Sequence, residues 1–557
     1  MKKILLLMWL CIALCACGGS GDVSITTSVS SDIKLNADDH GGLAAAVTAV
    51  GSAPVILVVS SDQTVLSSLT VPSNITLQVV DIASITVTSG TTLTINGPFE
   101  AGLYKVFTGD GAVTFGSRDV AKVHPEWWGA KRDGTSDDTG PVQAAINALS
   151  MGGEVAFVNG TYVVDSISLA SNISINGSGQ ESVIEQKKNA QYCCSINPGN
   201  GGTVDPKDNK RKIQIRNIHF RGTVAADGFS EHIHLLNINA ATDVTISDCW
   251  FSGWRGDGIY LGSSNLAETE RHNKSIVIKN CSFDGMNNDN RNAISVIDGD
   301  GVEIDNNSFT RCTRSNMPGA IDLEPDPNRF SVIQNISITR NKFDKIGGSV
   351  GIIALVLPLA QKDLINPSRN ILIQGNIING LIDSNRSKGI TLIQHQNVND
   401  TDTANEITIK GNNINNTSRP FVLLGIKGVT IENNAFSDSV FSGLISNIND
   451  HKSQDVAFKN NIFEYMGSIE GSGITIFSSN NISFTDNVFD NIGLSSGTYG
   501  IAISIPNINV NMIRIENNQF KGKTTTHALL LNSYTDPAKY TIQNNSYDTN
   551  IKPVIYQ

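Results

Sequence analysis

Apolar and polar residues alternate in short runs along most of the chain, and this alternation predicts strands. Ile, Val and Thr recur within the runs, whereas Gly, Asn and Asp, which favour turns, separate one run from the next. Aromatic residues make up only 6% of the 557 residues, and the chain contains 50 Gly. The pattern therefore predicts an all-β protein.

A short motif recurs from residue 215 onward and indicates that the strands belong to repeats. Twelve copies follow one another at spacings of 22 to 36 residues. Constant strands joined by loops of different length are typical of a solenoid of stacked turns. The copies are IRNIHF, ISDCWF, IKNCSF, IDNNSF, ITRNKF, IQGNII, IKGNNI, IENNAF, FKNNIF, FTDNVF, IENNQF and IQNNSY.

Most repeats contain a second short strand that begins at a small residue, as in DGIYLG, NAISVID and GAIDLEP. In GAIDLEP, alternation places Ile321 and Leu323 toward a core and Asp322 and Glu324 on the outer face. Parallel strands that stack turn upon turn predict a β-helix, a solenoid in which each turn adds one strand to each sheet.

The residue two positions before the end of each motif copy forms a column that we interpret as structural. A stacked amide can donate to one neighbour and accept from the other, and a column that runs the length of a rod is not a local site. Cys249 and Cys281 replace Asn at two neighbouring positions, where a disulfide and a stack of free thiols are both open alternatives. The asparagines are Asn307, Asn341, Asn376, Asn412, Asn434, Asn461, Asn487, Asn518 and Asn545.

Two segments near the N-terminus, residues 37–59 and 136–158, match almost without gaps, so the same supersecondary unit starts twice. The second copy predicts a short helix with one apolar face. We expect this helix to plug the open end of the coil. Its apolar face consists of Val142, Ala145, Ile146 and Leu149.

The first 30 residues predict export. Lys2 and Lys3 precede an apolar run that is too short to span a bilayer but suits a signal peptide. The sequence LCAC that follows resembles the bacterial lipobox, which implies lipidation of Cys17 and, with Gly18 after it, an anchored protein of the outer membrane, cell surface or periplasm. The chain then divides into a signal peptide (1–16), a lipidated linker (17–30), a small β-rich module (31–118) and a parallel β-helix domain (119–557).

The segment PEWWGAKRDGTSDDTGPVQAAINAL, with GGEVAFVNGTYVVDSISLASNISINGSG after it, resembles the entry segment of the pectate-lyase-like superfamily. This superfamily includes polygalacturonases, rhamnogalacturonases and phage tailspike depolymerases. The resemblance covers residues 125–180 closely and the later repeats generically. It implies a right-handed parallel β-helix, action on polysaccharide and, because related tailspikes are trimers, a homotrimer as one option. The Gly-His-Gly and Arg-x-Lys signatures of polygalacturonases are absent, and the superfamily also contains binding and structural members.

The charge of the chain narrows the choice of partner. A formal net charge of −11 repels nucleic acid and other polyanions at long range. We therefore expect no nucleic-acid partner, and the polysaccharide partner is the one that the resemblance implies.

Acidic residues coincide with the repeats that carry the longest loops. Asp257, Asp298, Asp322 and Glu324 fall in neighbouring repeats, and stacking is expected to bring them within a few turns of one another. Glycosidic cleavage uses one protonated carboxyl group and one carboxylate, and crowding of like charges raises one pKa. The sequence therefore predicts a glycoside hydrolase with Asp322 and Glu324 at the centre of a groove and Asp257 and Asp298 nearby.

Five further residues are candidates for substrate contacts. Trp254 and Tyr260 flank the predicted groove, where exposed rings would stack on sugar faces, although rings that cap the loops of the coil are an equal alternative. Asp326 and Arg329 follow the acidic strand, and His395 ends a strand two turns further on.

Two other functions fit the same residues. In a calcium-dependent polysaccharide lyase, Asp322, Glu324 and Asp326 would supply oxygen ligands for Ca²⁺ and Arg329 would be the base or a carboxylate clamp. In a glycan-binding protein or adhesin, the coil would be a rigid rod without catalysis. A zinc site at His232 and His234 is not expected, because no third ligand is evident.

Overall fold

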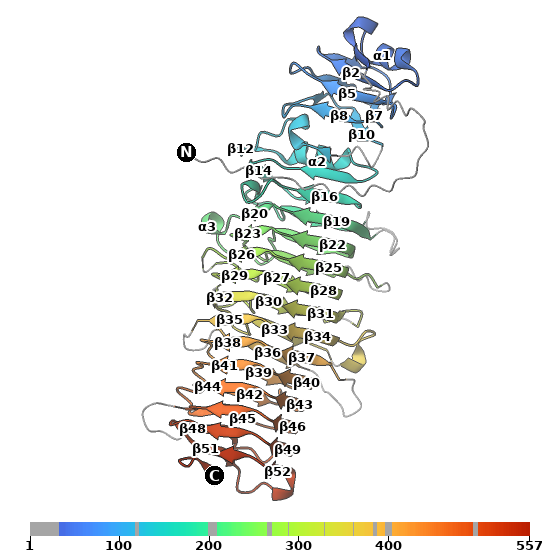
Figure 1. Cartoon of the computed structure of the whole chain (residues 1–557). Helices are drawn as coiled ribbons and strands as arrows, with labels where there is room; N and C mark the ends of the chain where they lie inside the picture. The colour runs from blue at the N-terminus through green and yellow to red at the C-terminus, as the bar shows by residue number, and fades with distance from the viewer. Residues whose placement is uncertain are drawn as a thin grey trace, which may run out of the picture.

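The computed structural model describes residues 33–116, 122–198, 209–263, 270–287, 289–312, 314–327, 329–359, 361–381, 387–395, 404–493 and 500–557. Over these ranges the chain forms an elongated coil of parallel strands (Figure 1). The predicted signal peptide, the predicted lipidation site Cys17 and the predicted linker lie outside the described residues. Within the described ranges, no helix combines the length and the apolar character needed to cross a bilayer.

Three long sheets run along the coil, and each strand pairs in parallel with the equivalent strand of the next turn. The first sheet has 15 strands from β11 (Lys122–Val123) to β52 (Tyr540–Gln543), the second has 15 from β12 (Asp133–Asp137) to β53 (Ser546–Tyr547), and the third has 14 from β15 (Ile167–Ser168) to β54 (Lys552–Tyr556). This topology confirms the predicted all-β parallel coil.

One turn of the coil consists of β28 (Gly299–Asp305), β29 (Ser308–Thr310) and β30 (Ile321–Leu323). The inward side chains Ile304, Phe309 and Ile321 are fully buried. Phe309 stacks on Phe283 of the preceding turn and on Phe343 of the next, with ring centroids 4.9 and 4.6 Å apart. These contacts join the turns into one continuous core. Burial of each such side chain contributes roughly 1.5–3 kcal/mol to the stability of the fold.

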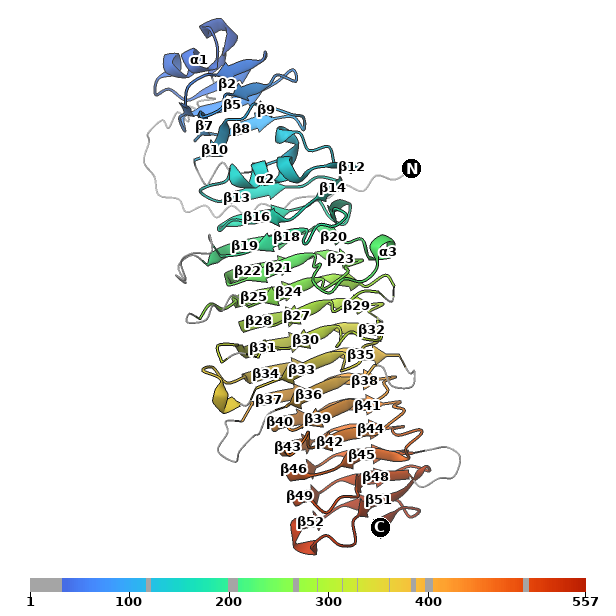
Figure 2. The ribbon, with the colours of Figure 1, turned by 180° about the vertical axis from the view of Figure 1, so that it is seen from behind.

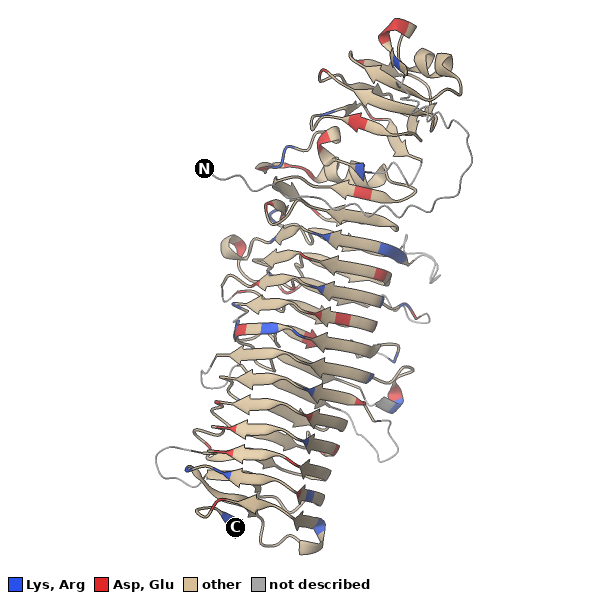
Figure 3. Ribbon diagram, viewed as in Figure 1, with Lys and Arg blue, Asp and Glu red and all other residues tan. Residues whose placement is uncertain are grey.

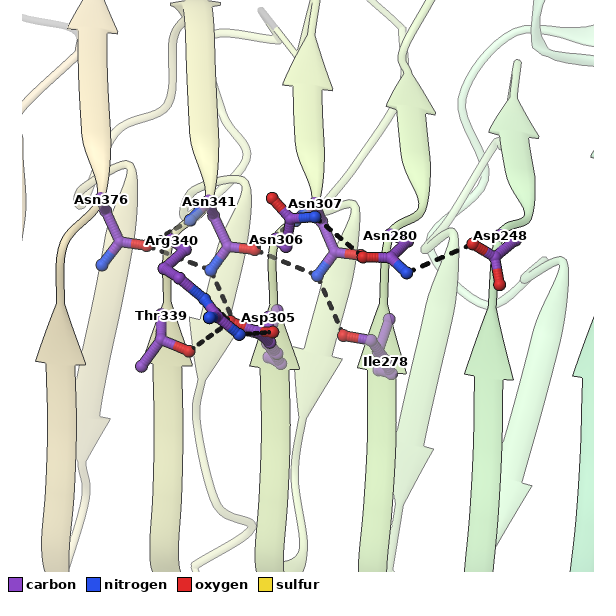
Figure 4. A network of polar contacts seen from close by, with 11 residues as sticks. Asp248, Ile278, Asn280, Asp305, Asn306, Asn307, Thr339, Arg340, Asn341 and Asn376 are labelled. Atoms are coloured by element: carbon purple, nitrogen blue, oxygen red, sulfur yellow. Dashed lines mark hydrogen bonds and ion pairs between the residues drawn. The ribbon is translucent and has the colours of Figure 1, made fainter. Parts of the chain in front are cut away.

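The asparagine column lies at the bend between the first and second sheets and is the predicted ladder (Figure 4). Asn341 Nδ2 donates to the Ile304 carbonyl at 2.8 Å and to Asn376 Oδ1 at 3.1 Å, while its own Oδ1 accepts from the backbone N–H and Nδ2 of Asn307. Equivalent bonds continue down to Asn545. The ladder satisfies buried backbone groups at the bend, which is a structural role.

The cysteines of the column are free thiols. All five cysteines in the described ranges are unpaired and buried, so the disulfide alternative for Cys249 and Cys281 is wrong. Their Sγ atoms lie 3.7 and 3.8 Å from the carbonyls of Ile215 and Ile246. The thiols therefore occupy the place of the amide in the column and pack as small apolar groups.

The N-terminal module forms a short coil of its own. Between Ile33 and Phe115 the strands build three small parallel sheets. The first sheet has the order β1 (Ile33–Asn36), β2 (Val55–Val59), β5 (Ile75–Val79) and β8 (Phe99–Ala101). The second has the order β3 (Gln63–Val65), β6 (Ile85–Val87) and β9 (Phe107–Thr108), and the third has the order β10 (Ala112–Phe115), β7 (Thr92–Ile95) and β4 (Leu69–Val71). Helix α1 (Leu43–Val50) lies at its tip, and helix α2 (Thr139–Asn147) lies between the module and the long coil (Figure 2). The duplicated sequence therefore starts one coil on top of another.

Helix α2 and the segment before it join the two coils. Val142, Ala145 and Ile146 of α2 are buried as predicted, and the Phe115 N–H donates to the Ala148 carbonyl at 2.8 Å. The Trp127 ring packs against Phe99 of the module at 4.8 Å between centroids. The helix thus covers the end of the long coil while the module covers the helix.

Candidate functional site

The third sheet places a column of side chains on its outer face. The column belongs to β24 (Ile259–Gly262), β27 (Ile294–Val296), β30 and β33 (Ile353–Leu357). Strand register pairs Tyr260 with Ser295, Ser295 with Asp322, and Asp322 with Ala354. Residues up to 94 positions apart in sequence therefore meet within four turns.

The predicted alternation in GAIDLEP is confirmed, because Ile321 and Leu323 belong to the buried core. Asp322 leaves the opposite face of β30 but has no exposed surface, so the expectation that it lies open in a groove is wrong. Neighbouring turns cover it, and Asn292 Nδ2 donates to its Oδ2 at 3.1 Å. Glu324, one pleat further, is only half-buried.

Asp322 and Glu324 are neighbouring acids at the end of β30. Burial, reinforced by the charge of Glu324, raises the pKa of Asp322 well above its ordinary value. The Oδ1 atom of Asp322 accepts no hydrogen bond from any of the described residues. Asp322 is therefore the buried acid whose protonated form is favoured, and Glu324 is the neighbouring acid nearer to solvent.

Asp257 is fully buried and bound to a cation. Arg291 Nη1 lies 3.0 Å from its Oδ1 and 3.1 Å from its Oδ2. Burial raises the pKa of Asp257 to about 6 and Arg291 opposes the rise, so the carboxylate is ionised at pH 7. The predicted catalytic role is not open to this carboxylate, because it neutralises the guanidinium and has no exposed surface.

His234 completes the floor of the site. Its Nδ1 accepts the backbone N–H of Asp257 at 3.0 Å, so its ring proton resides on Nε2. Burial, followed by the charge of Arg291, lowers the pKa of His234 to about 3, and the ring is neutral at physiological pH. It stacks on the Tyr260 ring with centroids 4.5 Å apart and planes 8° from parallel.

A cleft of about 380 Å³ opens over these residues. Prolines 325, 327 and 358 and Ile297 form part of its wall. The polar and aromatic side chains that line it are Glu231, His232, His234, Tyr260, Arg291, Glu324 and Asp326. Tyr260, Glu324 and Asp326 were expected at a groove, and they line this cleft. Their contact with a substrate stays a prediction.

Sequence reasoning missed Glu231 and Arg291, and it considered His232 and His234 only as zinc ligands. Glu231 and Arg291 each precede a strand of the third sheet by a few residues, at the bend where loops of adjacent turns meet. A search for charged residues just before the strands, in addition to those within them, could have found both.

Other predicted site residues lie elsewhere. Trp254 is completely buried, with its Nε1 donating to the Arg291 carbonyl at 3.2 Å, so the exposed-ring prediction is wrong for it. Asp298 is buried against His272, whose Nδ1 lies 2.8 Å from its Oδ2. Arg329 and His395 are exposed but do not line the cleft.

Burial works to lower the pKa of His272, but Asp298 and Glu270 outweigh it and raise the pKa. Asp298 also accepts the Asn273 N–H at 3.1 Å. This cluster lies at the bend between the third and first sheets, where Asp298 has no exposed surface, so the expectation of an open catalytic carboxylate is wrong for it.

The carboxyl groups do not converge on a metal position. Over the part of the chain that the structure describes, no three His, Cys, Asp or Glu side chains are grouped so that they could hold a metal ion. The predicted calcium ligands Asp322, Glu324 and Asp326 are described residues and do not form such a group. The Oδ2 atom of Asp322 already accepts a hydrogen bond from Asn292.

Solved structures similar to this chain share its fold. The N-terminal fragment of gene product 12 of bacteriophage phi29 has a TM-score of 0.58 at 16% identity, with 76% of this chain and 70% of that chain covered. The pre-mature form of the same gene product has a TM-score of 0.60 at 16% identity, with 78% of this chain and 56% of that chain covered. The chain is a right-handed parallel β-helix.

A third similar structure comes from a bacterial enzyme. The β-helix matches the A-module of the mannuronan C-5 epimerase AlgE6 of Azotobacter vinelandii with a TM-score of 0.50 at 16% identity, covering 76% of this chain and 99% of that module. No protein-family model and no curated protein sequence matches the chain. At these identities the likeness concerns the fold alone.

Proposed function

We propose that this β-helix cleaves glycosidic bonds of a polysaccharide in the cleft over β24, β27 and β30. The observation that carries the proposal is the coupled pair of Asp322 and Glu324, in which a buried carboxyl group with a raised pKa stands behind one that lines the cleft. A proton donor that is still protonated at neutral pH is the first requirement of glycosidic cleavage.

Glu324 is the member of the pair that reaches the substrate. In this proposal Glu324 passes a proton to the glycosidic oxygen as the bond to the anomeric carbon breaks. Asp322, whose pKa is raised by burial and by the neighbouring carboxylate, is the group that supplies this proton to Glu324. The pair takes up a proton from solvent before the next cycle.

The second carboxyl group must be ionised, and Glu231 fits this role best. Its Oε1 lies 3.7 Å from Arg291 Nη2, and its side chain faces the cleft. Partial burial raises the pKa of Asp326, the other acid of the cleft, which makes it the weaker base candidate. Glu231 would take a proton from the attacking water or stabilise the positive charge that develops on the sugar ring.

The remaining support comes from the cleft. The flat Tyr260 ring, backed by His234, offers a face on which a sugar can stack. This feature also suits a glycan-binding protein, so turnover must decide between a hydrolase and a binding protein.

We also propose that the protein acts outside the cytoplasm, held by a lipid on Cys17. The support is the N-terminal sequence MKKILLLMWLCIALCAC, which has a short apolar core followed by a lipobox-like ending. A polysaccharide of the cell envelope or surroundings is then within reach of the rod.

Release of new reducing ends from a panel of polysaccharides tests the proposal. Glu324→Gln should lower the turnover of any glycan that the wild type cleaves by at least about 100-fold, because it removes the proton donor. Glu303→Gln, which changes an exposed acid on the first sheet, is the matched control and should retain full activity. Binding without turnover by the wild type would favour the glycan-binding alternative, and unsaturated products would favour a lyase.

A further inference from the structure

Building on the proposed hydrolase function, we propose that the cleft selects glycans whose sugars carry free, protonated amino groups and rejects glycans built from uronic acids. The inference rests on which charges in the cleft are already neutralised and which are not.

The positive charge of Arg291 in the cleft is paired with the buried carboxylate of Asp257. Arg291 is the one Lys or Arg among the described residues that line the cleft, and its side chain is only 15% exposed. Asp257 holds it through both carboxylate oxygens, and His234 is a second basic side chain beside Asp257, with its Nδ1 3.3 Å from Oδ2. A uronate would have to compete with this buried carboxylate, so Arg291 is not a clamp for an acidic sugar.

The neighbouring imidazole adds no positive charge. His234 is neutral because burial lowers its pKa to about 3. The backbone N–H of Asp257 fixes the ring proton on Nε2, as described above. His234 therefore acts as a neutral ring stacked on Tyr260. The charged pair in the floor of the cleft consists of Arg291 and Asp257.

The negative charges of the cleft are not balanced in the same way. Glu231 is 54% exposed and lies 3.7 Å from a guanidinium that is already neutralised. Asp326 lines the cleft and forms no salt bridge with any of the described residues. Glu324 adds a third acid to the lining of the cleft. The cleft therefore presents a surplus of negative charge to its ligand.

This surplus favours one chemical class of sugar. An ammonium group on a hexosamine would pair with Glu231 or Asp326, and a cation over the Tyr260 ring is also favoured. A uronate or sulfate would meet carboxylates on approach. The net charge of −11 acts in the same direction at long range, and in the view of Figure 3 the Lys and Arg residues are scattered along the rod without a continuous basic stripe.

Binding of monosaccharides tests the selectivity without any cleavage. The probes are glucosamine and galactosamine, their N-acetyl forms, and glucuronic and galacturonic acid, with affinities measured by ligand-observed NMR at low and high salt on the full-length protein. We expect the free amino sugars to bind at least about fivefold more tightly than the N-acetyl forms and the uronic acids to bind most weakly, with the difference shrinking in high salt.

Two double variants locate the effect. Glu231→Gln/Asp326→Asn should abolish the preference for the amino sugars. Glu303→Gln/Asp363→Asn removes the same charge from two exposed acids outside the cleft and should leave the preference unchanged. Equal binding of amino and N-acetyl sugars, tighter binding of the uronic acids, a preference that survives the cleft variant, or no binding of any probe would each overturn the inference.

The two proposals can fail separately. If Glu324→Gln keeps full turnover while the amino-sugar preference is found, the hydrolase mechanism is wrong and the charge selectivity stands. If Glu324→Gln loses turnover while the preference is absent, the mechanism stands and the selectivity is wrong.

Discussion

Replacement of Arg291 by Met tests how the floor of the cleft is built. The substitution leaves Asp257, which has no exposed surface, without the guanidinium that binds both of its oxygens at 3.0 and 3.1 Å. Removal of one partner of a buried ion pair typically costs about 3–5 kcal/mol, because the remaining charge stays buried and unpaired. Since Met has a similar length and is apolar, we expect a loss of this size in the free energy of unfolding at pH 7.

The pH dependence of the loss identifies its cause. With Arg291 present the pKa of Asp257 is about 6 in the folded protein, and without it the pKa rises further above the ordinary value of a free Asp. An acid whose pKa is raised on folding adds stability at low pH and loses it as pH rises through the folded pKa. The deficit of Arg291→Met should therefore be largest at pH 8 and shrink toward pH 5.

Urea unfolding followed by circular dichroism measures both quantities. The double variant Asp257→Asn/Arg291→Met removes both charges and should recover most of the lost stability, since paired removal leaves no uncompensated ion. A single variant within about 1 kcal/mol of the wild type at pH 8, or a deficit that does not change with pH, would refute the idea that Asp257 is an ionised anchor for Arg291.

Four other predictions follow from the fold and the site. Asn341→Ala should lower the free energy of unfolding by about 2–4 kcal/mol in the same urea assay, because the Asn307 N–H and the Ile304 carbonyl lose their amide partner in the buried ladder. A change below about 0.5 kcal/mol would contradict the structural role of the ladder. Asp322→Asn removes a carboxyl group whose pKa is raised on folding, so the stability of the wild type relative to this variant should fall as pH rises from 5 to 9, and parallel pH profiles would count against the raised pKa. Trp254→Ala should cost about 3–5 kcal/mol through the cavity it leaves, whereas Trp254→Phe should retain glycan affinity, and loss of affinity with intact folding would show that the ring contacts substrate. Cys17→Ser should abolish incorporation of radiolabelled palmitate in cells, and labelling that persists would exclude Cys17 as the lipidated residue.

The sequence was sufficient for the fold because the same pattern repeats in every turn. Alternation in GAIDLEP correctly separated Ile321 and Leu323 from Asp322, and the Asn307 to Asn545 column correctly indicated a ladder. These features depend only on neighbours at fixed positions in adjacent turns, which a repeat makes visible in one dimension.

The site was harder to predict because loops decide what is covered. Alternation showed that Asp322 leaves the core face but not that neighbouring turns bury it. It also gave no sign that Trp254 lies inside the coil or that Asp298 binds His272. Arg291 and Glu231 were not predicted because they lie in the loops before the strands. In these loops the position of a side chain depends on the path of the backbone and does not follow the period of the repeat.

The state of the carboxyl pair is the central claim, and infrared spectroscopy reads it directly. The difference spectrum between the wild type and Asp322→Asn at pH 7 should contain the carbonyl stretch of a protonated carboxyl group that is lost in the variant, because burial and the charge of Glu324 raise the pKa of Asp322. A difference spectrum that contains only carboxylate bands would mean that both groups are ionised, and Glu324 could then not act as the acid of a glycoside hydrolase at neutral pH.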